Sequence, residues 1–284
     1  MANDMAANSI PTEHFEIVDA HQHTGDISDA LPFHGAIAKN ISVEEDVAIR
    51  LRAMNALAID WTILQPPHAY ECWDGIQATM RINDTMARYR EADPAKFRLI
   101  AGTIEPMHGE RSLVELDRVK YELKLDAVSW HHRFQGCFID SRWMFPILRK
   151  MSDLNLVPIV HVNAESTIEA HWRLQRLAKE FPDLTFLAFD GLWSSNLSQQ
   201  ILESAMETPN IIWDFGGPTR VKVQQWVQRN GSTNICFSAD IPYGASHTIK
   251  EPHLRKEIES ANIAWEDKAN IFGRNIRRAF GMPV

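Results

Sequence analysis

The chain has 284 residues, of which 45% are hydrophobic and 23% are charged, with 12 His and only 3 Cys. This apolar fraction excludes a disordered chain, and the three widely spaced cysteines exclude a disulfide scaffold and suit a reducing cytoplasm. The net charge of −8 argues against nucleic acid as a partner. No apolar run reaches the roughly 18 residues that a membrane helix requires. We therefore expect a cytoplasmic globular protein that binds neither nucleic acid nor a membrane.

Residues 1–14 lack the apolar stretch of a secretory signal peptide, and they include Asp4 and Glu13. We expect them to form a flexible N-terminal arm. Residues 15–284 contain no internal repeat and no linker, so we expect them to form one domain.

From Phe15 onward, short apolar runs alternate with longer stretches that have helical spacing. Most of the runs are continuously apolar, which is typical of parallel strands covered on both faces. They span residues 15–23, 61–66, 97–106, 126–132, 156–163, 184–191, 210–217 and 234–243.

A helix-like stretch follows each apolar run, and the first of these stretches begins with Ser42 and Glu45 at the spacing of a capping box. Eight strand–helix units predict a single (β/α)8 TIM barrel with a parallel sheet. A doubly wound open sheet is the alternative. It usually has fewer units and a glycine-rich turn after the first strand, and no such turn is found here.

Polar residues at the strand ends indicate a metal site, because the chemistry of a TIM barrel takes place at the C-terminal ends of its strands. Asp19, His21 and His23 alternate along the first strand, so we expect them to point to one face. His161 lies in an otherwise apolar fifth strand, and Asp240 ends the eighth. One divalent cation shared by His21, His23, His161 and Asp240 would satisfy these buried groups. A hydrogen-bond network of the same residues without metal is the alternative.

Zn²⁺ is the cation that we expect first, and Mn²⁺ also tolerates imidazole and carboxylate ligands. Asp19 is expected to hold one imidazole in the correct tautomer.

Several segments resemble the amidohydrolase-related branch of the amidohydrolase superfamily. This branch includes aminocarboxymuconate-semialdehyde decarboxylase, resorcylate decarboxylases and pyrone-dicarboxylate lactonases. The similar segments are residues 19–23, 83–106, 128–136, His161, 238–240 and 271–280.

The resemblance implies a TIM barrel with metal ligands at His21, His23, His161 and Asp240. Ser129 stands where binuclear relatives have a carbamylated lysine, which implies one metal ion.

The end of the sixth strand departs from the family pattern, which usually reads His-x-Gly there. Asp190 stands in place of this histidine. Three interpretations remain open: a base that accepts a proton from metal-bound water, an ordinary hydrogen-bonded carboxylate, or a sign of altered chemistry.

These residues lead us to expect a metal-dependent hydrolase that activates water to attack a lactone, ester or amide of a small carboxylated substrate. Asp240 would bind the metal and pass a proton to the leaving group, with Asp190 or His131 assisting. The same residues also support non-oxidative decarboxylation of a carboxylated aromatic or muconate-type acid. A metal-independent lactonase and a non-catalytic ligand-binding barrel are further alternatives.

Substrate contacts are expected at the loops that follow three strands. Arg133 follows the fourth strand beside His132 and suits a bidentate contact with a substrate carboxylate. His68 and Tyr70, after the second strand, and Trp193, after the sixth, would line a pocket for a ring. A homodimer is expected only from the general prevalence of twofold symmetry.

Overall fold

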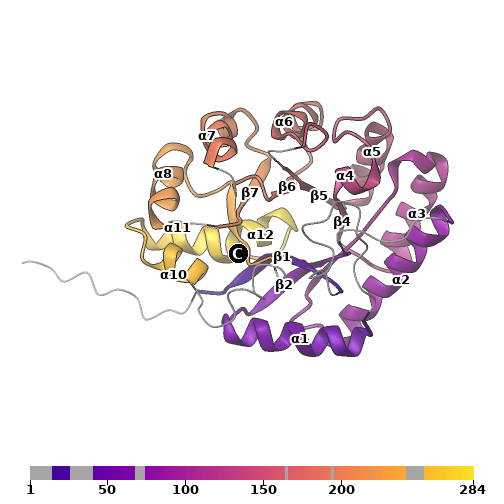
Figure 1. Ribbon diagram of the computed structural model, residues 1–284, viewed down its shortest axis with the longest axis horizontal. Coiled ribbons are helices and arrows are strands. Elements are labelled where there is room, and N and C mark those ends of the chain that lie inside the picture. The colour runs from indigo at the N-terminus through magenta and orange to yellow at the C-terminus, as the bar shows by residue number, and fades with distance from the viewer. Residues whose placement is uncertain are drawn as a thin grey trace, which may run out of the picture.

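A computed structural model describes residues 15–25, 41–67, 74–163, 166–192, 195–217, 219–240 and 253–284. Eight strands form one sheet in sequence order, and every neighbouring pair is parallel. Strand β8 contacts β1, so the sheet nearly closes on itself. The predicted TIM barrel is confirmed (Figure 1). The strands are β1 (Val18–His23), β2 (Trp61–Gln65), β3 (Leu99–Gly102), β4 (Ala127–Trp130), β5 (Val157–His161), β6 (Phe186–Phe189), β7 (Ile211–Phe215) and β8 (Ile235–Phe237).

Helices surround the strands (Figure 1). The first helix begins as its sequence predicts, because the Ser42 hydroxyl accepts the backbone N–H of Glu45, whose carboxylate accepts the N–H of Ser42. The α-helices are α1 (Val43–Ala56), α2 (Ile76–Ala92), α3 (Glu110–Tyr121), α4 (His132–Gln135), α5 (Met144–Leu154), α6 (His171–Glu180), α7 (Ser195–Ser204), α8 (Arg220–Asn230), α10 (His253–Glu259), α11 (Trp265–Ala269) and α12 (Asn275–Ala279). Short helical segments are η1 (Pro106–His108), η2 (Ala205–Glu207) and the π-helix η3 (Asn270–Arg274). Among the described helices, none is both long and apolar enough to span a membrane.

The apolar core has two layers. The inner layer consists of strand residues such as Val18, Ile63, Ile159 and Leu187, which fill the barrel. The outer layer packs the other face of the strands against the helices. Because both faces of the sheet are covered, the strands are apolar without alternation, and the polar residues that interrupt them are informative.

Strand β1 contains a bulge between Asp19 and Gln22, a stretch that includes the predicted ligand His21. From Asp19 to Gln22 the chain advances three residues while β2 advances only two, from Thr62 to Leu64. Val18 belongs to the inner layer before this extra residue, and the strand changes phase after it. Strict alternation predicted that Asp19 shares the face of the two histidines. Because of the bulge, it does not.

Asp19 instead joins the two ends of the barrel. Its Oδ1 atom accepts the backbone N–H groups of Ala239, after β8, at 2.8 Å and of His21 at 3.1 Å. Its Oδ2 atom accepts the side-chain amide of Gln22 at 2.9 Å. Burial raises the pKa of Asp19 to about 6 in spite of these hydrogen bonds. Asp19 thus holds the backbone around His21, and its hydrogen bonds go to backbone N–H groups and to Gln22.

Candidate metal centre

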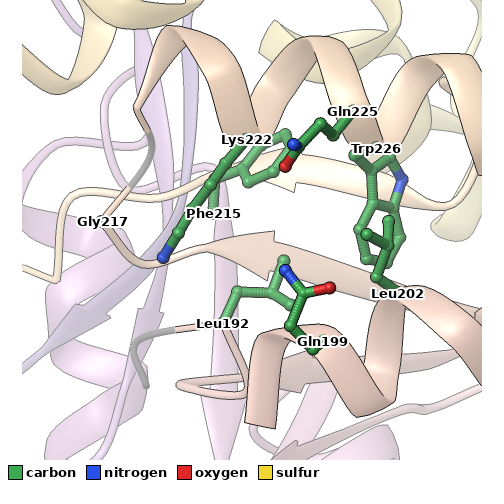
Figure 2. A pocket seen from close by; sticks show the side chains of 8 residues that line it. All are labelled: Leu192, Gln199, Leu202, Phe215, Gly217, Lys222, Gln225 and Trp226. Carbon is green, nitrogen blue, oxygen red and sulfur yellow. The ribbon is translucent and has the colours of Figure 1, made fainter. Parts of the chain in front are cut away.

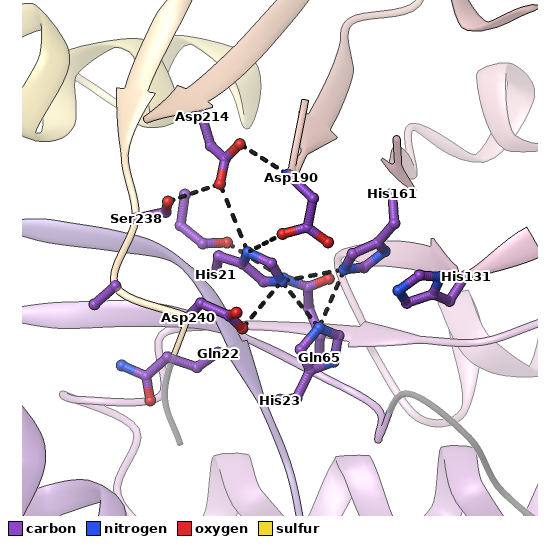
Figure 3. A network of polar contacts seen from close by, with 12 residues as sticks. His21, Gln22, His23, Gln65, His131, His161, Asp190, Asp214, Ser238 and Asp240 are labelled. Atoms are coloured by element: carbon purple, nitrogen blue, oxygen red, sulfur yellow. Dashed lines mark hydrogen bonds and ion pairs between the residues drawn. The ribbon is translucent and has the colours of Figure 1, made fainter. Parts of the chain in front are cut away.

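Three imidazoles from two strands meet at one point near the ends of β1 and β5. The Nε2 atom of His21 lies 2.9 Å from that of His23 and 3.1 Å from that of His161. The Nε2 atoms of His23 and His161 are also 3.1 Å apart. All three side chains are buried. The predicted histidine cluster therefore forms (Figure 3), and its ring nitrogens lie close enough together to bind one ion.

The outer nitrogens of these rings determine what the inner ones can do. Nδ1 of His23 lies 2.6 Å from the carbonyl oxygen of Pro66, and Nδ1 of His161 lies 2.8 Å from that of Trp130. A carbonyl oxygen only accepts, so both Nδ1 atoms carry the hydrogen. When the rings of His23 and His161 are neutral, the Nε2 atom of each ring directs its lone pair at the Nε2 atom of the other ring. Two lone pairs at 3.1 Å repel unless a cation lies between them, so the cluster fits a metal ion.

Three carboxylates surround His21. Asp240 Oδ1 lies 3.6 Å from its Nε2 atom, while Asp214 Oδ2 and Asp190 Oδ1 lie 3.6 Å and 4.0 Å from its Nδ1 atom. The Nδ1 atom of His21 and the Oδ1 atom of Asp240 are buried, and neither has a hydrogen-bond partner among the described residues. Asp240 is thus placed beside the imidazole cluster with an unused oxygen, as a fourth metal ligand requires.

The charges of this group are strongly coupled. Burial opposes a positive charge on His21, but Asp240, Asp214 and Asp190 outweigh it and raise the pKa of His21 to about 10. Burial raises the pKa of Asp190, and the negative charges of Asp240 and Asp214 raise it further. A divalent cation bound among these groups would favour the charged carboxylates and the neutral form of His21.

Asp190 and Asp240 share an uncommon backbone conformation. Their φ angles are 66° and 50°, in the left-handed region that costs energy for any residue except glycine and is best tolerated by Asn and Asp. Asp190 directly follows β6, and Asp240 lies a short way beyond the end of β8. The chain thus turns sharply where each carboxylate faces His21, and strain of this kind is concentrated at functional sites.

His131 and Arg133 lie beside the cluster. The ring of His131 lies parallel to that of His161, with centroids 4.5 Å apart and planes at 9°. Nη2 of Arg133 lies 3.3 Å from Nε2 of His131. The positive charge of Arg133 also acts on Asp190 and lowers its pKa. The structure therefore brings both predicted residues to the edge of the candidate metal centre.

His132 has a different environment from the one we expected. It is fully buried, its Nδ1 atom lies 3.3 Å from Sγ of Cys137, and its ring stacks on Trp130. Burial lowers its pKa to about 4. His132 is thus packed against Cys137 and Trp130, and its expected contact with a substrate stays a prediction. The remaining predicted substrate contacts, His68, Tyr70 and Trp193, lie outside the described residues, as does the 1–14 arm.

Two site residues were not predicted from the sequence. Asp214 on β7 faces His21 and accepts the Ser238 hydroxyl at 2.7 Å and the backbone N–H of Asp190 at 3.0 Å. The sequence could have indicated Asp214, because it is a charged residue within an apolar strand. His161 was found by the same pattern in β5. Glu169, which accepts a hydrogen bond from His131, lies in the segment between β5 and α6, where no pattern distinguishes it.

Ser129 lies inside the barrel, and its hydroxyl donates to the side-chain oxygen of Gln65 at 2.8 Å. A neutral hydrogen-bonded pair thus fills the position at which the family resemblance places a lysine in binuclear members.

A cavity outside the barrel is lined mainly by apolar and amide side chains (Figure 2). It lies between α7 and α8, and none of its lining residues has an imidazole or a carboxylate. The lining residues are Leu192, Gln199, Leu202, Phe215, Gly217, Lys222, Gln225 and Trp226. It is therefore separate from the metal-binding cluster.

Comparison with other proteins relates the chain to solved structures. The sequence matches no model of a protein family and no curated protein sequence. A structural match is 5-carboxyvanillate decarboxylase from Sphingomonas paucimobilis, with a TM-score of 0.71 and 17% identity over 95% of this chain and 100% of that chain. A second is 4-oxalomesaconate hydratase from Rhodopseudomonas palustris, with a TM-score of 0.70 and 17% identity over 93% of this chain and 95% of that chain.

A third match is the 5-carboxyvanillate decarboxylase of Novosphingobium aromaticivorans, with a TM-score of 0.70 and 16% identity over 94% of this chain and 97% of that chain. That structure contains manganese and 3-methoxy-4-hydroxy-5-nitrobenzoic acid. Further matches are 2,6-dihydroxybenzoate decarboxylases and structures described as amidohydrolases. These matches confirm the TIM-barrel fold that the resemblance implies.

Proposed function

We propose that this protein is a metal-dependent decarboxylase of the amidohydrolase-related type, which removes CO₂ from a small carboxylated aromatic acid without oxidation. The observation that carries the proposal is the meeting of three imidazole Nε2 atoms beside the unpartnered oxygen of Asp240. The identity of the structural neighbours supports decarboxylation over the hydrolysis that we expected first, because aromatic decarboxylases predominate among them.

His21, His23, His161 and Asp240 would hold the metal ion. Zn²⁺ and Mn²⁺ both suit these ligands, and the manganese in a neighbour's structure supports the second. When bound, the ion supplies Lewis-acid polarisation of substrate oxygens. Ser129 and Gln65 complete a neutral surface inside the barrel and supply no further ligand charge.

Arg133 would receive a substrate carboxylate. Its guanidinium lies over the ring of Phe134 at 5.0 Å and beside His131, and its side chain is only 18% exposed. A guanidinium held in place in this way binds a carboxylate through two parallel hydrogen bonds. His131 adds an acceptor next to it, so the pair can orient an acid that also carries a hydroxyl group.

Asp190 is the group that we assign to proton transfer. Its side chain is 20% exposed, whereas those of Asp240 and Asp214 are 6% and 0% exposed, so both substrate and solvent reach it most easily. The protonated Asp190 carboxyl would give its hydrogen to the ring carbon that bears the leaving carboxylate. The C–H bond forms, the C–C bond breaks, CO₂ leaves, and solvent returns a proton to Asp190.

Hydrolysis remains the second candidate, because structures described as amidohydrolases share this fold. The site would then use the same ligands to activate water, with Asp190 or Asp240 as the base. The two reactions differ in whether CO₂ or a new acid is released.

A single assay separates the candidates. The protein, loaded with Mn²⁺ or Zn²⁺, is incubated in D₂O with ring-hydroxylated benzoic acids and 5-carboxyvanillate, each ¹³C-labelled at the carboxyl group. Decarboxylation predicts labelled CO₂ and one deuterium on the ring. Asp190→Asn should reduce the rate at least 100-fold, whereas Asp183→Asn, an exposed carboxylate before β6, serves as the matched control.

Lactones, esters and amides of the same acids are tested in parallel in H₂¹⁸O. Incorporation of ¹⁸O into a product acid without labelled CO₂ would replace decarboxylation by hydrolysis. An absence of both products across the two panels would refute the proposed reaction class.

A further inference from the structure

Glu169 is a buried carboxylate that contacts two of the residues next to the metal-binding cluster. Its Oε1 atom accepts the Nδ1–H of His131 at 2.6 Å and the backbone N–H of Arg133 at 2.9 Å. Its Oε2 atom lies 3.7 Å from Nε of Arg133. The side chain has no exposed surface. Burying a carboxylate costs free energy unless hydrogen bonds compensate for the lost water, so these contacts of Glu169 are expected to matter for the site.

The contacts of Glu169 determine the hydrogen positions on His131. An ionised carboxylate only accepts, so the hydrogen of His131 must lie on Nδ1. The Nη2 group of Arg133 can only donate, and it lies 3.3 Å from Nε2 of His131. The Nε2 atom therefore accepts with its lone pair, and the ring is neutral.

The orientation of the ring follows from the same contacts. His131 is held at Nδ1 by Glu169 and lies parallel to the predicted metal ligand His161. The backbone N–H of Arg133 is held by the same oxygen atom. One carboxylate from the segment after β5 thus fixes the connection from β4 into α4, where both residues lie.

We propose that Glu169 is a positioning residue that holds His131 in the Nδ1–H tautomer and places Arg133 beside it, so that the site presents one acceptor and one guanidinium next to the imidazole cluster. The role of this pair in substrate binding rests on the proposed function. The tautomer and the placement do not, because they follow from contacts within the protein.

Nuclear magnetic resonance of the metal-free protein labelled with ¹⁵N-histidine tests the proposal without any substrate. Two-bond ¹⁵N–¹H spectra distinguish the two neutral tautomers and the charged ring, and His131→Asn identifies the His131 signals. In the wild-type protein we expect the Nδ1–H tautomer. In Glu169→Ala we expect a mixture of tautomers, because the acceptor is gone.

Glu169→Gln provides the rescue, since its amide oxygen can still accept both N–H groups. We expect it to keep the Nδ1–H tautomer. Glu115→Gln is the matched control, because Glu115 is also a buried carboxylate but accepts hydrogen bonds from Asn83 and Arg118 instead. It should leave the His131 signals unchanged.

An Nε2–H tautomer or a charged ring at His131 in the wild-type protein would overturn the proposal, and this test does not require any variant to fold. Unchanged His131 signals in a folded Glu169→Ala protein would overturn it too. If decarboxylation is found, Glu169→Ala should raise KM for the acid roughly tenfold, as expected for the loss of one charge-assisted contact. Failure of the decarboxylation assay alone leaves the tautomer result standing.

Discussion

Asp214 Oδ2 lies 3.6 Å from Nδ1 of His21, on the opposite side of the imidazole from the nitrogen that faces the other two histidines. Asp214 is fully buried and is held in place by the Ser238 hydroxyl. A carboxylate in this position orients the ring and increases the basicity of the nitrogen that binds the metal. We therefore predict that Asp214 supports His21 from this side.

Asp214→Asn should weaken metal binding about 10- to 100-fold, because carboxylates that support metal-binding histidines have effects of this size. Competition with a chromophoric chelator for Mn²⁺ or Zn²⁺ measures the change. Asp126→Asn is the matched control, since Asp126 is a largely buried carboxylate that pairs with Arg90 away from the cluster. Equal affinities for the wild type and Asp214→Asn would contradict the assigned contact.

His161→Asn should abolish the stabilisation of the protein by metal. A ligand that binds only the folded state and is present at 100 times its Kd raises the free energy of unfolding by about 2.7 kcal/mol. For a chain of this size, this corresponds to a rise in Tm of roughly 5 °C or more. Thermal unfolding with and without added ion, together with elemental analysis, gives the result. His171→Asn, in α6, is the control. A metal-induced rise in Tm that survives in His161→Asn would exclude this residue as a ligand.

The backbone strain at Asp190 predicts a difference between two uncharged variants. Asp190→Asn and Asp190→Ala both remove the carboxylate, but Asn tolerates the left-handed conformation better than Ala. We expect Asp190→Ala to be less stable than Asp190→Asn by about 1 kcal/mol in urea unfolding. The same pair at Asp183 should show no such difference. Equal stabilities at position 190 would mean that the turn relaxes in the variants.

Glu16 gives the stability of the barrel a dependence on pH. Hydrogen bonds from Arg277 hold its pKa below the usual value, helped by Trp61 and Arg98 and opposed by partial burial. A folded-state pKa below the unfolded one gives stability that is present above the unfolded pKa and is lost as the pH falls through the folded pKa. Glu16→Gln should therefore cost about 1 kcal/mol at pH 7.

This cost should shrink as the pH is lowered below about 4, because the wild type then loses the same charge. Urea unfolding at pH 7 and pH 3.5 measures it. Glu207→Gln is the comparison, since Glu207 pairs with Lys179 on the surface, where both side chains are more than half exposed. Its effect at pH 7 should be smaller than that of Glu16→Gln. A cost at position 16 that is constant with pH would rule out the charge as its source.

The fold and much of the cluster could be predicted because apolar strands make their polar exceptions visible. His161 and Asp240 were found in this way, and so were His21 and His23. The bulge in β1 could not be predicted, because nothing in the residues of β1 shows where an extra residue enters the strand. Glu169 could not be predicted either, because its role depends on the end of β4, which lies more than thirty residues earlier in the chain.

The hydrogen bond between Asp19 and Ala239 spans 220 residues of sequence. Contacts of such long range form late, because the chain entropy lost in closing the loop must be offset by structure already present. Asp240, the neighbour of Ala239, reaches His21 only when this final contact is made. During synthesis on the ribosome, the emerging chain therefore lacks the complete set of proposed metal ligands until the eighth strand is released and docks against the first.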